Sequence, residues 1–209
     1  MSVVSTIALR INRMAKGKPF HRKAFAEIGS PSAISKALAK MVQSGSLQRI
    51  TRGVYMRPHW RKYIGQIEAS PVEVMKVIAE ANGEIIQTHG AEAIRRFRLS
   101  TQMQVVPVYY TSGATRKIRI GRTIISLQHV SKKRLQYAGT NVGLALTALY
   151  YLGRKGVSDV TLAKICVLLN SQELATLRTC QMPQWMIVIL NDFCEDSAPS
   201  LQPGGDASP

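Results

Sequence analysis

The order of apolar and polar residues near the start of the chain predicts three short helices. Apolar residues recur every three or four positions over residues 5–15, which is typical of a helix with one buried face. Residues 21–28 are expected to form a second, shorter helix. The third helix is expected to begin at Ser30 and Pro31, which suit the N-cap and the first helical position, and to run to about Ser44.

A tight hairpin is expected to follow the third helix. Residues 47–50 and 54–55 have the apolar character of short strands, and the turn 51–53 ends in glycine, which adopts positive φ most easily. Three helices followed by a hairpin are the order of elements in a winged helix-turn-helix. In a helix-turn-helix the recognition helix lies in the DNA major groove.

The rest of the chain predicts a mixed region and then a helical one. Residues 59–69 are expected to form a basic connector, and Ser70, Pro71 and Glu73 match a capping box that begins a helix ending near residue 82. Further strands are expected over 84–88, 104–111 and 117–127, the last with a turn at 121–122, and further helices over 90–98, from 141, and over 158–169, 171–179 and 183–194.

These elements predict an α+β fold with two domains. An N-terminal winged helix-turn-helix with its basic connector would occupy residues 1–69, and a mixed α/β unit with a C-terminal helical region would occupy residues 70–195. The tail 196–209 is polar and contains proline and glycine, so we expect it to be disordered.

Positive charge is concentrated in the first two thirds of the chain. The 209 residues carry a net charge of +16, with +11 in residues 1–69, +7 in 70–138 and −2 in 139–209. Such an excess favours a polyanionic partner, either nucleic acid or an anionic membrane surface. No apolar run approaches the ~20 residues of a membrane span, and the start of the chain does not match a secretory signal. We therefore expect a soluble, cytoplasmic protein without a membrane partner.

Residues that could support catalysis are sparse. The sequence contains no Walker loop, dinucleotide-binding glycine motif, zinc-protease motif or nucleophile elbow, and its acidic residues are scattered. Its four histidines are far apart along the chain. We therefore expect no enzyme, no catalytic residue, no metal and no cofactor. Cys166, Cys180 and Cys194 are expected to be buried, reduced thiols.

Three groups of residues in the first domain fit DNA binding. Short hydroxyls allow close approach to base edges, glutamine can pair with adenine, and lysine can reach guanine or phosphate. Arginines at a hairpin tip suit phosphate contacts, and amides at a helix N-terminus favour phosphate. The candidates are Ser32, Ser35, Lys36, Lys40 and Gln43 on the recognition helix, Arg49, Thr51, Arg52 and Arg57 on the wing, and His21, Arg22 and Lys23 as phosphate contacts.

A second basic set lies further along the chain. In the strand after residue 116, alternation should place Lys117 and Arg119 on one face and Ile118 and Ile120 on the other. Such a face is either a solvated sheet surface or a secondary basic track that extends phosphate binding, and the sequence leaves both open. The secondary track would comprise Lys117, Arg119 and Arg122, and the wider set adds Arg95, Arg96, Arg98, Arg116, Lys132, Lys133 and Arg134.

The run AISKALAKMVQSGSLQRITRGVYMRP, residues 33–58, resembles the N-terminal winged helix of the AbiEi-type antitoxins of type IV toxin–antitoxin (abortive infection) systems. The similarity continues through GEIIQTHGAEAIRRFRLSTQ, VYYTSGATRKIRIGRTIISL and ALTALYYLGRKGV, to about Leu190. Carried over by position, it implies recognition-helix residues Ser32, Ser35, Lys36 and Lys40 and wing residues Arg49, Thr51 and Arg52.

The resemblance also implies a function for each domain. The N-terminal domain would bind inverted repeats in double-stranded DNA of its own promoter, as a monomer or a dimer, and repress the operon of a bacterial or plasmid host. The C-terminal domain would counteract a nucleotidyltransferase-like toxin, directly or indirectly. No short motif in residues 139–195 matches a toxin-contact site.

Besides an enzyme with an unrecognised site, which the low content of acidic residues fits poorly, two other functions stay open on the sequence. One is a stand-alone plasmid- or phage-borne transcriptional regulator without a toxin. The other is an RNA-binding or protein-binding module that uses the same basic face. RNA binders more often interleave aromatic residues with cations, and the winged-helix segment largely lacks such aromatics.

Overall fold

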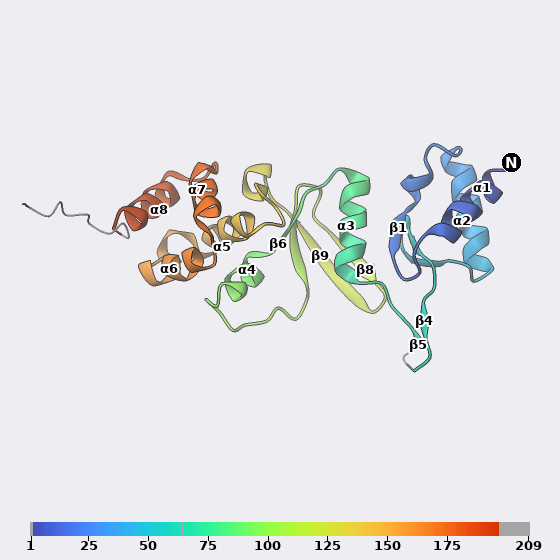
Figure 1. Ribbon diagram of the computed structural model, residues 1–209, viewed down its shortest axis with the longest axis horizontal. Coiled ribbons are helices and arrows are strands. Elements are labelled where there is room, and N and C mark those ends of the chain that lie inside the picture. Colours follow the sequence, from blue (N-terminus) through green and yellow to red (C-terminus); the bar gives the residue numbers. More distant parts are fainter. Residues whose placement is uncertain (1, 64, 197–209) are drawn as a thin grey trace, which may run out of the picture. The chain divides into compact units, whose positions relative to one another are not determined.

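The computed structural model describes residues 2–63 and 65–196, with side chains up to residue 193 (Figure 1). Its helices and small sheets confirm the expected α+β class. The chain forms two compact units. Unit 1 contains Met1–Gln87 and Gln104–Leu135, and unit 2 contains Thr88–Met103 and the residues from Gln136 onward. The chain therefore leaves unit 1, returns to it and leaves it again.

Two helices and a three-stranded sheet form the N-terminal part of unit 1. The helix expected over residues 21–28 is wrong, because Phe20 and His21 pair with a neighbouring strand and leave room for a single 3-10 turn. The elements are α1 (Val3–Arg13), β1 (Pro19–His21), the 3-10 turn η1 (Arg22–Phe25), α2 (Pro31–Gln43), β2 (Gln48–Thr51) and β3 (Val54–Met56).

Helix α2 forms where the sequence predicts it. The Ser30 side-chain oxygen accepts a hydrogen bond of 3.3 Å from the backbone N–H of Ala33, so the expected N-cap is present. Ile34, Leu38 and Met41 are buried in an apolar cluster that they share with α1. This packing leaves the opposite, polar side of α2 facing solvent.

Strand β3 lies at the centre of the sheet β1-β3-β2, and all three of its residues are buried. Because side chains alternate along a strand, Tyr55 points to one face of the sheet and Val54 and Met56 point to the other. Tyr55 belongs to the α1–α2 cluster and stacks on Phe20. Val54 and Met56 belong to a second apolar cluster. Its other residues lie between positions 50 and 127, so none of them comes from α1 or α2.

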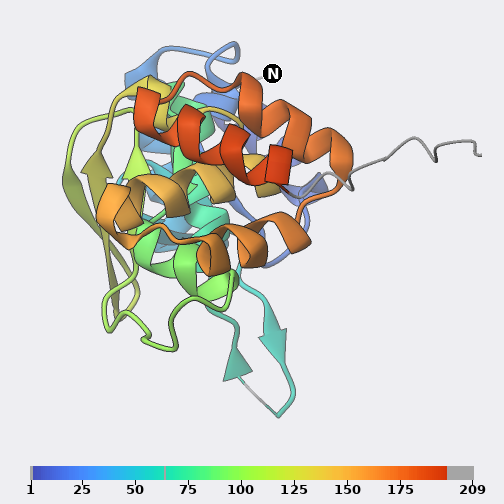
Figure 2. The same cartoon turned by 90° about the vertical axis from the view of Figure 1, so that its left-hand side faces the viewer.

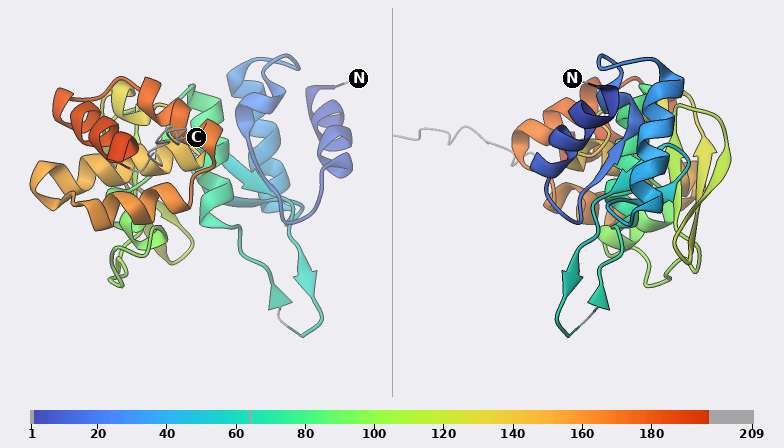
Figure 3. Two further views of the ribbon diagram at one scale, coloured as in Figure 1. Left: turned by 60° about the vertical axis from the view of Figure 1, so that its left-hand side comes forward. Right: turned by 90° about the vertical axis from the view of Figure 1, so that its right-hand side faces the viewer.

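Residues 59–69, expected to be a basic connector, contain a two-stranded hairpin instead. Strand β4 (Trp60–Arg61) pairs antiparallel with β5 (Gly65–Gln66). Figures 2 and 3 show this hairpin standing clear of the sheets and helices of unit 1. The basic segment is therefore a projection from unit 1.

A helix and a four-stranded sheet complete unit 1. The helix begins at Pro71 as predicted, but Ser70 makes no side-chain cap hydrogen bond, so the expected capping box is not formed. The sheet has the order β6-β7-β9-β8, with β7 parallel and β8 antiparallel to β9. The elements are α3 (Pro71–Asn82), β6 (Ile86–Thr88), β7 (Val108–Thr111), β8 (Arg116–Ile120), β9 (Thr123–His129) and the 3-10 turn η2 (Lys132–Leu135).

The two units do not coincide with the division expected at residues 69 and 70. Val54 and Met56 share their buried cluster with Val74, Ile118 and Ile125, which come after that boundary. The apolar second face of β3 needs a cover, and α3 and the four-stranded sheet supply it. The N-terminal elements and this sheet therefore form one compact body.

Helices pack around a separate apolar core in unit 2, and Figure 2 turns this unit toward the viewer. Leu146, Leu149, Leu162 and Ile165 are almost completely buried at its centre. The helices expected in this region are confirmed as α4 (Gly90–Arg96), α5 (Asn141–Gly156), α6 (Asp159–Val167), α7 (Ser171–Thr179) and α8 (Gln184–Asp196). The expected disordered tail lies outside the described residues except for Asp196, which ends α8.

The cysteines of unit 2 differ in burial. Cys180 is buried, as expected, and burial raises the pKa of its thiol, which stays protonated at neutral pH. Cys166 is only half-buried. The side chain of Cys194 lies outside the described residues.

Two kinds of feature are absent from the residues that the structure describes. Among residues 2–63 and 65–196, no helix has the length and apolar character needed to cross a bilayer. The same residues contain no group of three or more His, Cys, Asp or Glu side chains placed to hold a metal ion.

Removing the side chain that joins β3 to the second cluster should destabilise unit 1. Met56 is fully buried, so Met56→Ala is expected to lower the free energy of unfolding by about 2–5 kcal/mol. Denaturant titration followed by circular dichroism measures this change. Met103 is 78% exposed, so Met103→Ala is the matched control and should change the free energy by less than about 0.5 kcal/mol. Equal effects of the two substitutions would contradict the assigned packing.

Candidate nucleic-acid interface

The solvent-facing side of α2 carries most of the residues expected to contact bases. Ser32, Lys36, Lys40 and Gln43 are exposed, and among the described residues their side chains make no hydrogen bond or ion pair. With 3.6 residues per turn, these four and Ala39 lie within about 100° of the helix surface. They form a continuous stripe that an external partner can reach.

Cations from separate parts of unit 1 line one open hollow beside α2, which has a volume of about 770 Å³. Seven of its lining residues are lysine or arginine, and none of the lining residues is acidic. We call it the basic hollow. It is lined by His21, Arg22, Lys23, Ser35, Ala39, Arg49, Thr51, Arg52, Gly53, Tyr55, Ile78, Asn82, Arg116, Lys117, Ile118 and Arg119.

The turn between β2 and β3 packs closely against β1. Gly53 has a φ of +78°, which side-chain-bearing residues rarely adopt. Its carbonyl accepts a hydrogen bond of 2.9 Å from the backbone N–H of Arg22. A Cβ atom on Gly53 would lie 2.8 Å from Nε2 of His21. Glycine is therefore required here both for the backbone conformation and for the close approach of His21.

His21 adds no charge to the basic hollow at neutral pH. Its Nδ1 accepts a hydrogen bond of 3.2 Å from the backbone N–H of Lys23, which caps η1. Partial burial, followed by the charges of Lys23 and Arg22, lowers the pKa of His21 below its usual value. The imidazole is therefore neutral at pH 7, and the positive charge comes from the lysines and arginines.

Arg22 and Lys23, the other two residues expected to contact phosphate, form hydrogen bonds within the protein. Arg22 donates from Nη1 to Oγ of Ser35 at 3.3 Å, and that hydroxyl donates to the carbonyl of Pro31 at 2.8 Å. Arg22 is thereby oriented along the side of α2. Lys23 donates from Nζ to the carbonyl of Ala81, in the last turn of α3, where a cation is favourable.

Strand β8 brings part of the second basic set into the basic hollow. The predicted alternation is confirmed, because Ile118 and Ile120 are buried while Lys117 and Arg119 are exposed. Strand β8 lies beside β2, so these two cations line the same hollow as the arginines of the β2–β3 hairpin. Arg122, in the β8–β9 turn, does not line it.

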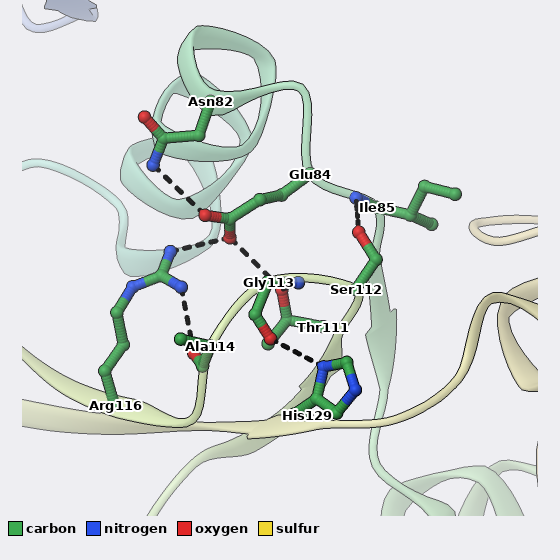
Figure 4. Close-up of polar contacts among 9 residues, drawn as sticks. All are labelled: Asn82, Glu84, Ile85, Thr111, Ser112, Gly113, Ala114, Arg116 and His129. Carbon is green, nitrogen blue, oxygen red and sulfur yellow. Dashed lines mark hydrogen bonds and ion pairs between the residues drawn. The ribbon is translucent and has the colours of Figure 1, made fainter.

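A mostly buried carboxylate holds the start of β8. Glu84, whose side chain is 13% exposed, accepts at Oε2 from Nη2 of Arg116 at 2.6 Å and from Oγ1 of Thr111 at 3.1 Å (Figure 4). Its Oε1 accepts from Nδ2 of Asn82 at 3.2 Å. Arg116 also donates from Nη1 to the carbonyl of Ala114 at 3.0 Å. Arg116 of the basic hollow is thus paired with a mostly buried carboxylate, while Lys117 and Arg119 on the same strand remain available.

The loop that leads into β8 folds tightly over Glu84. The Gly113 N–H donates to Oγ1 of Thr111 at 3.0 Å, and the Gly113 carbonyl contacts Nδ1 of His129 at 2.8 Å (Figure 4). A Cβ on Gly113 would lie 2.4 Å from Cδ of Glu84, so a larger residue would displace the carboxylate. These contacts fix the direction in which β8 leaves the loop.

Arg57, expected on the wing, lies elsewhere. Its Nη1 donates to the carbonyl of Asn12 at 2.8 Å and to that of Met14 at 2.7 Å, at the C-terminal end of α1. It does not line the basic hollow. The side chain therefore serves as a cap for α1, whose last carbonyls have no partner within the helix.

Six lining residues were not among the candidates from the sequence, namely Ala39, Gly53, Tyr55, Ile78, Asn82 and Ile118. Ala39 lies one turn after Ser35 on the same side of α2, so helical spacing alone could have identified it. Ile78 and Asn82 come from α3, roughly forty residues further along the chain. No local sequence pattern indicates that α3 closes the hollow.

The arginines near residue 95 belong to unit 2, and none of them is among the residues that line the basic hollow. Arg95 donates from Nε to Glu92 at 2.6 Å, and Arg96 does so at 3.1 Å. Hydrogen bonding by Arg95 is the main cause that lowers the pKa of the Glu92 carboxyl. Part of the charge of this group is therefore neutralised locally.

Comparison with protein families gives one match. The model of the family described as "Family of unknown function (DUF6088)" matches residues 6–177. The chain belongs to the DUF6088 family. No protein of curated function matches the sequence. The region shared with the family includes every residue that lines the basic hollow.

The charge of this DUF6088 protein resides in unit 1. Unit 1 contains 21 lysine and arginine residues against 5 aspartate and glutamate residues, a net charge of +16. The described residues of unit 2 contain 7 against 6, a net charge of +1. A polyanion would therefore be attracted to unit 1, where the basic hollow lies.

The two arginines expected on the wing should behave differently. Arg57→Ala leaves two helix-end carbonyls without their donor and is expected to lower the free energy of unfolding by about 1–2 kcal/mol. Arg52→Ala removes an exposed side chain and should change it by less than about 0.5 kcal/mol. Urea titration compares the two variants. A stability loss in Arg52→Ala as large as that in Arg57→Ala would contradict these roles.

Proposed function

We propose that this DUF6088 protein is a DNA-binding antitoxin and autorepressor that acts in the bacterial cytoplasm, bound to the promoter of its own operon. The observation that carries the DNA-binding half is the basic hollow, in which cations from η1, the β2–β3 hairpin and β8 converge beside the exposed stripe of α2. In this proposal α2 is the recognition helix of a winged helix-turn-helix, and the β2–β3 hairpin is its wing.

Helix α2 has the features needed to read base edges. Lys36, Lys40 and Gln43 are long, exposed side chains, and Ser32 and Ala39 are short enough to let the helix approach the floor of a groove. A B-DNA major groove about 12 Å wide admits one helix. In the proposed complex Lys36 and Gln43 contact base edges, and Lys40 contacts either a base edge or a phosphate.

The basic hollow would hold one sugar–phosphate strand at the edge of that groove. Its volume of about 770 Å³ is similar to that of pockets for small ligands, and is therefore too small for the full width of a duplex. Arg49 and Arg52 from the wing would contact the strand from one side, and Lys117 and Arg119 from β8 would contact it from the other. Lys117 and Arg119 of the secondary basic track thus become part of the same phosphate contact, whereas Arg122 does not.

The antitoxin half of the proposal is supported by the resemblance to AbiEi-type antitoxins. The cognate partner would be a nucleotidyltransferase-like toxin, counteracted directly or indirectly. Unit 2 is nearly neutral and has its own apolar core, which suits a protein-facing role better than a second DNA-binding one. The operator would consist of inverted repeats, occupied by monomers or by a dimer.

Substitutions on α2 and on the wing should affect DNA binding in different ways. Lys36→Ala is expected to reduce discrimination between the operator and altered bases by about 1–3 kcal/mol. Arg52→Ala is expected to weaken binding to all duplexes and to reduce the slope of log K against log salt by about 1. Fluorescence anisotropy with the upstream promoter region and point-substituted duplexes measures both effects.

The control for these measurements is Arg154→Ala, because Arg154 is an exposed arginine of unit 2. It should leave both base preference and salt slope unchanged. Wild-type binding in both the Lys36→Ala and Arg52→Ala variants would refute the site assignment.

Co-expression tests the antitoxin half. The full-length protein is expected to restore the growth of cells that produce the nucleotidyltransferase encoded next to it, measured as colony counts. The Lys36→Ala variant should still rescue when both genes are driven by a foreign promoter, because toxin antagonism is assigned to unit 2. Failure of the wild-type protein to rescue, together with intact operator binding, would instead identify a stand-alone regulator.

A further inference from the structure

The β4–β5 hairpin exposes two aromatic rings to solvent. Trp60 is 68% exposed and Tyr63 is 90% exposed. Neither ring belongs to a hydrophobic cluster of the described residues, and each strand of the hairpin packs mainly on the other. We call Trp60, Arg61, Lys62 and Tyr63 the arm.

Such a hairpin has little intrinsic stability. Its register consists of the pairs Trp60 with Gln66 and Arg61 with Gly65. An isolated two-stranded hairpin is marginal in water, and large exposed aromatic side chains usually mark a surface that contacts a partner. The aromatic residues of the arm are therefore not explained by the fold of unit 1.

The chemistry of the arm favours nucleic acid. Two cations stand between the two aromatic residues, and Nζ of Lys62 lies 5.7 Å from the centre of the Tyr63 ring. Cations neutralise phosphates, and aromatic rings pack against sugars and bases. The arm itself contains no acidic residue, and it belongs to the unit that carries a net charge of +16. A duplex is thus a better match than an apolar protein surface.

The base of the arm is fixed to the same sheet as the wing. Gln66 donates from Nε2 to Oε1 of Gln48, the first residue of β2, at 2.6 Å. From Gln48 to Thr51, at the wing turn, β2 spans about 10 Å at ~3.3 Å per residue. The residues from Trp60 to Tyr63 reach about 10 Å further. At 3.4 Å per base pair, the arm can contact DNA about 3–6 base pairs from the wing contact.

We propose that the arm is a second DNA contact, which binds the duplex that flanks the operator half-site read by α2. Arg61 and Lys62 contact phosphates of the flank, and Trp60 and Tyr63 pack against its deoxyribose and base edges. This inference rests on the proposed DNA-binding function. It adds a flank requirement that α2 and the wing alone would not impose.

The test compares two duplexes, one containing the operator alone and one with ten additional base pairs on each side. The wild-type protein is expected to bind the longer duplex more tightly. Arg61→Ala combined with Lys62→Ala should abolish that preference and reduce the salt slope on the longer duplex by about 1.8, because two phosphate contacts are lost. The wild-type advantage over this variant should then shrink about 12-fold between 50 and 200 mM salt.

A second variant separates aromatic packing from charge. Trp60→Ala combined with Tyr63→Ala should reduce the preference for the longer duplex while leaving the salt slope unchanged. In hydroxyl-radical footprints, both double variants should lose protection about 3–6 base pairs outside the wing contact. Because all four side chains of the arm are exposed, both variants should melt at the wild-type temperature.

The control is Arg154→Ala combined with Lys155→Ala, an adjacent and exposed Arg–Lys pair in unit 2. It should keep the wild-type footprint, salt slope and flank preference. Operator binding with an unchanged flank preference in both arm variants would overturn the arm contact and leave the proposed function standing. Absence of any wild-type binding to the promoter would overturn both.

Discussion

The burial of β3 on both faces is the packing on which the rest of unit 1 depends. Tyr55 is covered by α1 and α2, and Val54 and Met56 are covered by α3 and the four-stranded sheet. All three residues of this short strand are buried, so β3 forms part of both apolar cores. Because the strand cannot move relative to one core without disturbing the other, the N-terminal elements and the later sheet are held as one body.

The packing of β3 into both cores has an electrostatic consequence. It brings β8 next to β2, and so it brings Lys117 and Arg119 next to Arg49 and Arg52. Like charges brought together repel one another, and the fold offsets only part of that repulsion: Glu84 pairs with Arg116, while the other cations face the open hollow. A structure that keeps several cations together without acidic neighbours is suited to a polyanion, whose binding would relieve the repulsion.

The positive side chains have several different roles, although they look alike in the sequence. Arg57 caps α1, Lys23 binds the last turn of α3, and the arginines of α4 pair with Glu92. Arg61 and Lys62 belong to the arm and are exposed. A count of basic residues therefore overstates the number available to a ligand. Only contacts in space separate the structural cations from the free ones.

The sequence by itself determined several of the local elements and indicated a class of partner. Ser30, Pro31 and the spacing of Ile34, Leu38 and Met41 defined α2, since caps and helical periodicity act over a few residues. Gly53 defined the β2–β3 turn, and strand alternation separated Lys117 and Arg119 from Ile118 and Ile120. The net charge of +16 indicated a polyanion. All of these signals are local or additive.

Tertiary structure decided which of these elements form one body and one site. No local sequence pattern indicates that the second face of β3 is buried, so local signals were compatible with a domain boundary at residue 69. Local patterns also did not indicate that strand pairing replaces the helix expected over residues 21–28, or that residues 59–69 contain a hairpin. They gave no sign that Asn82 lines the basic hollow. Apart from the hairpin, whose strands are close neighbours in the sequence, each of these outcomes depends on a partner tens of residues away, and sequence periodicity carries no information about such partners. The basic hollow exists only because packing brings β8 to the β2–β3 hairpin.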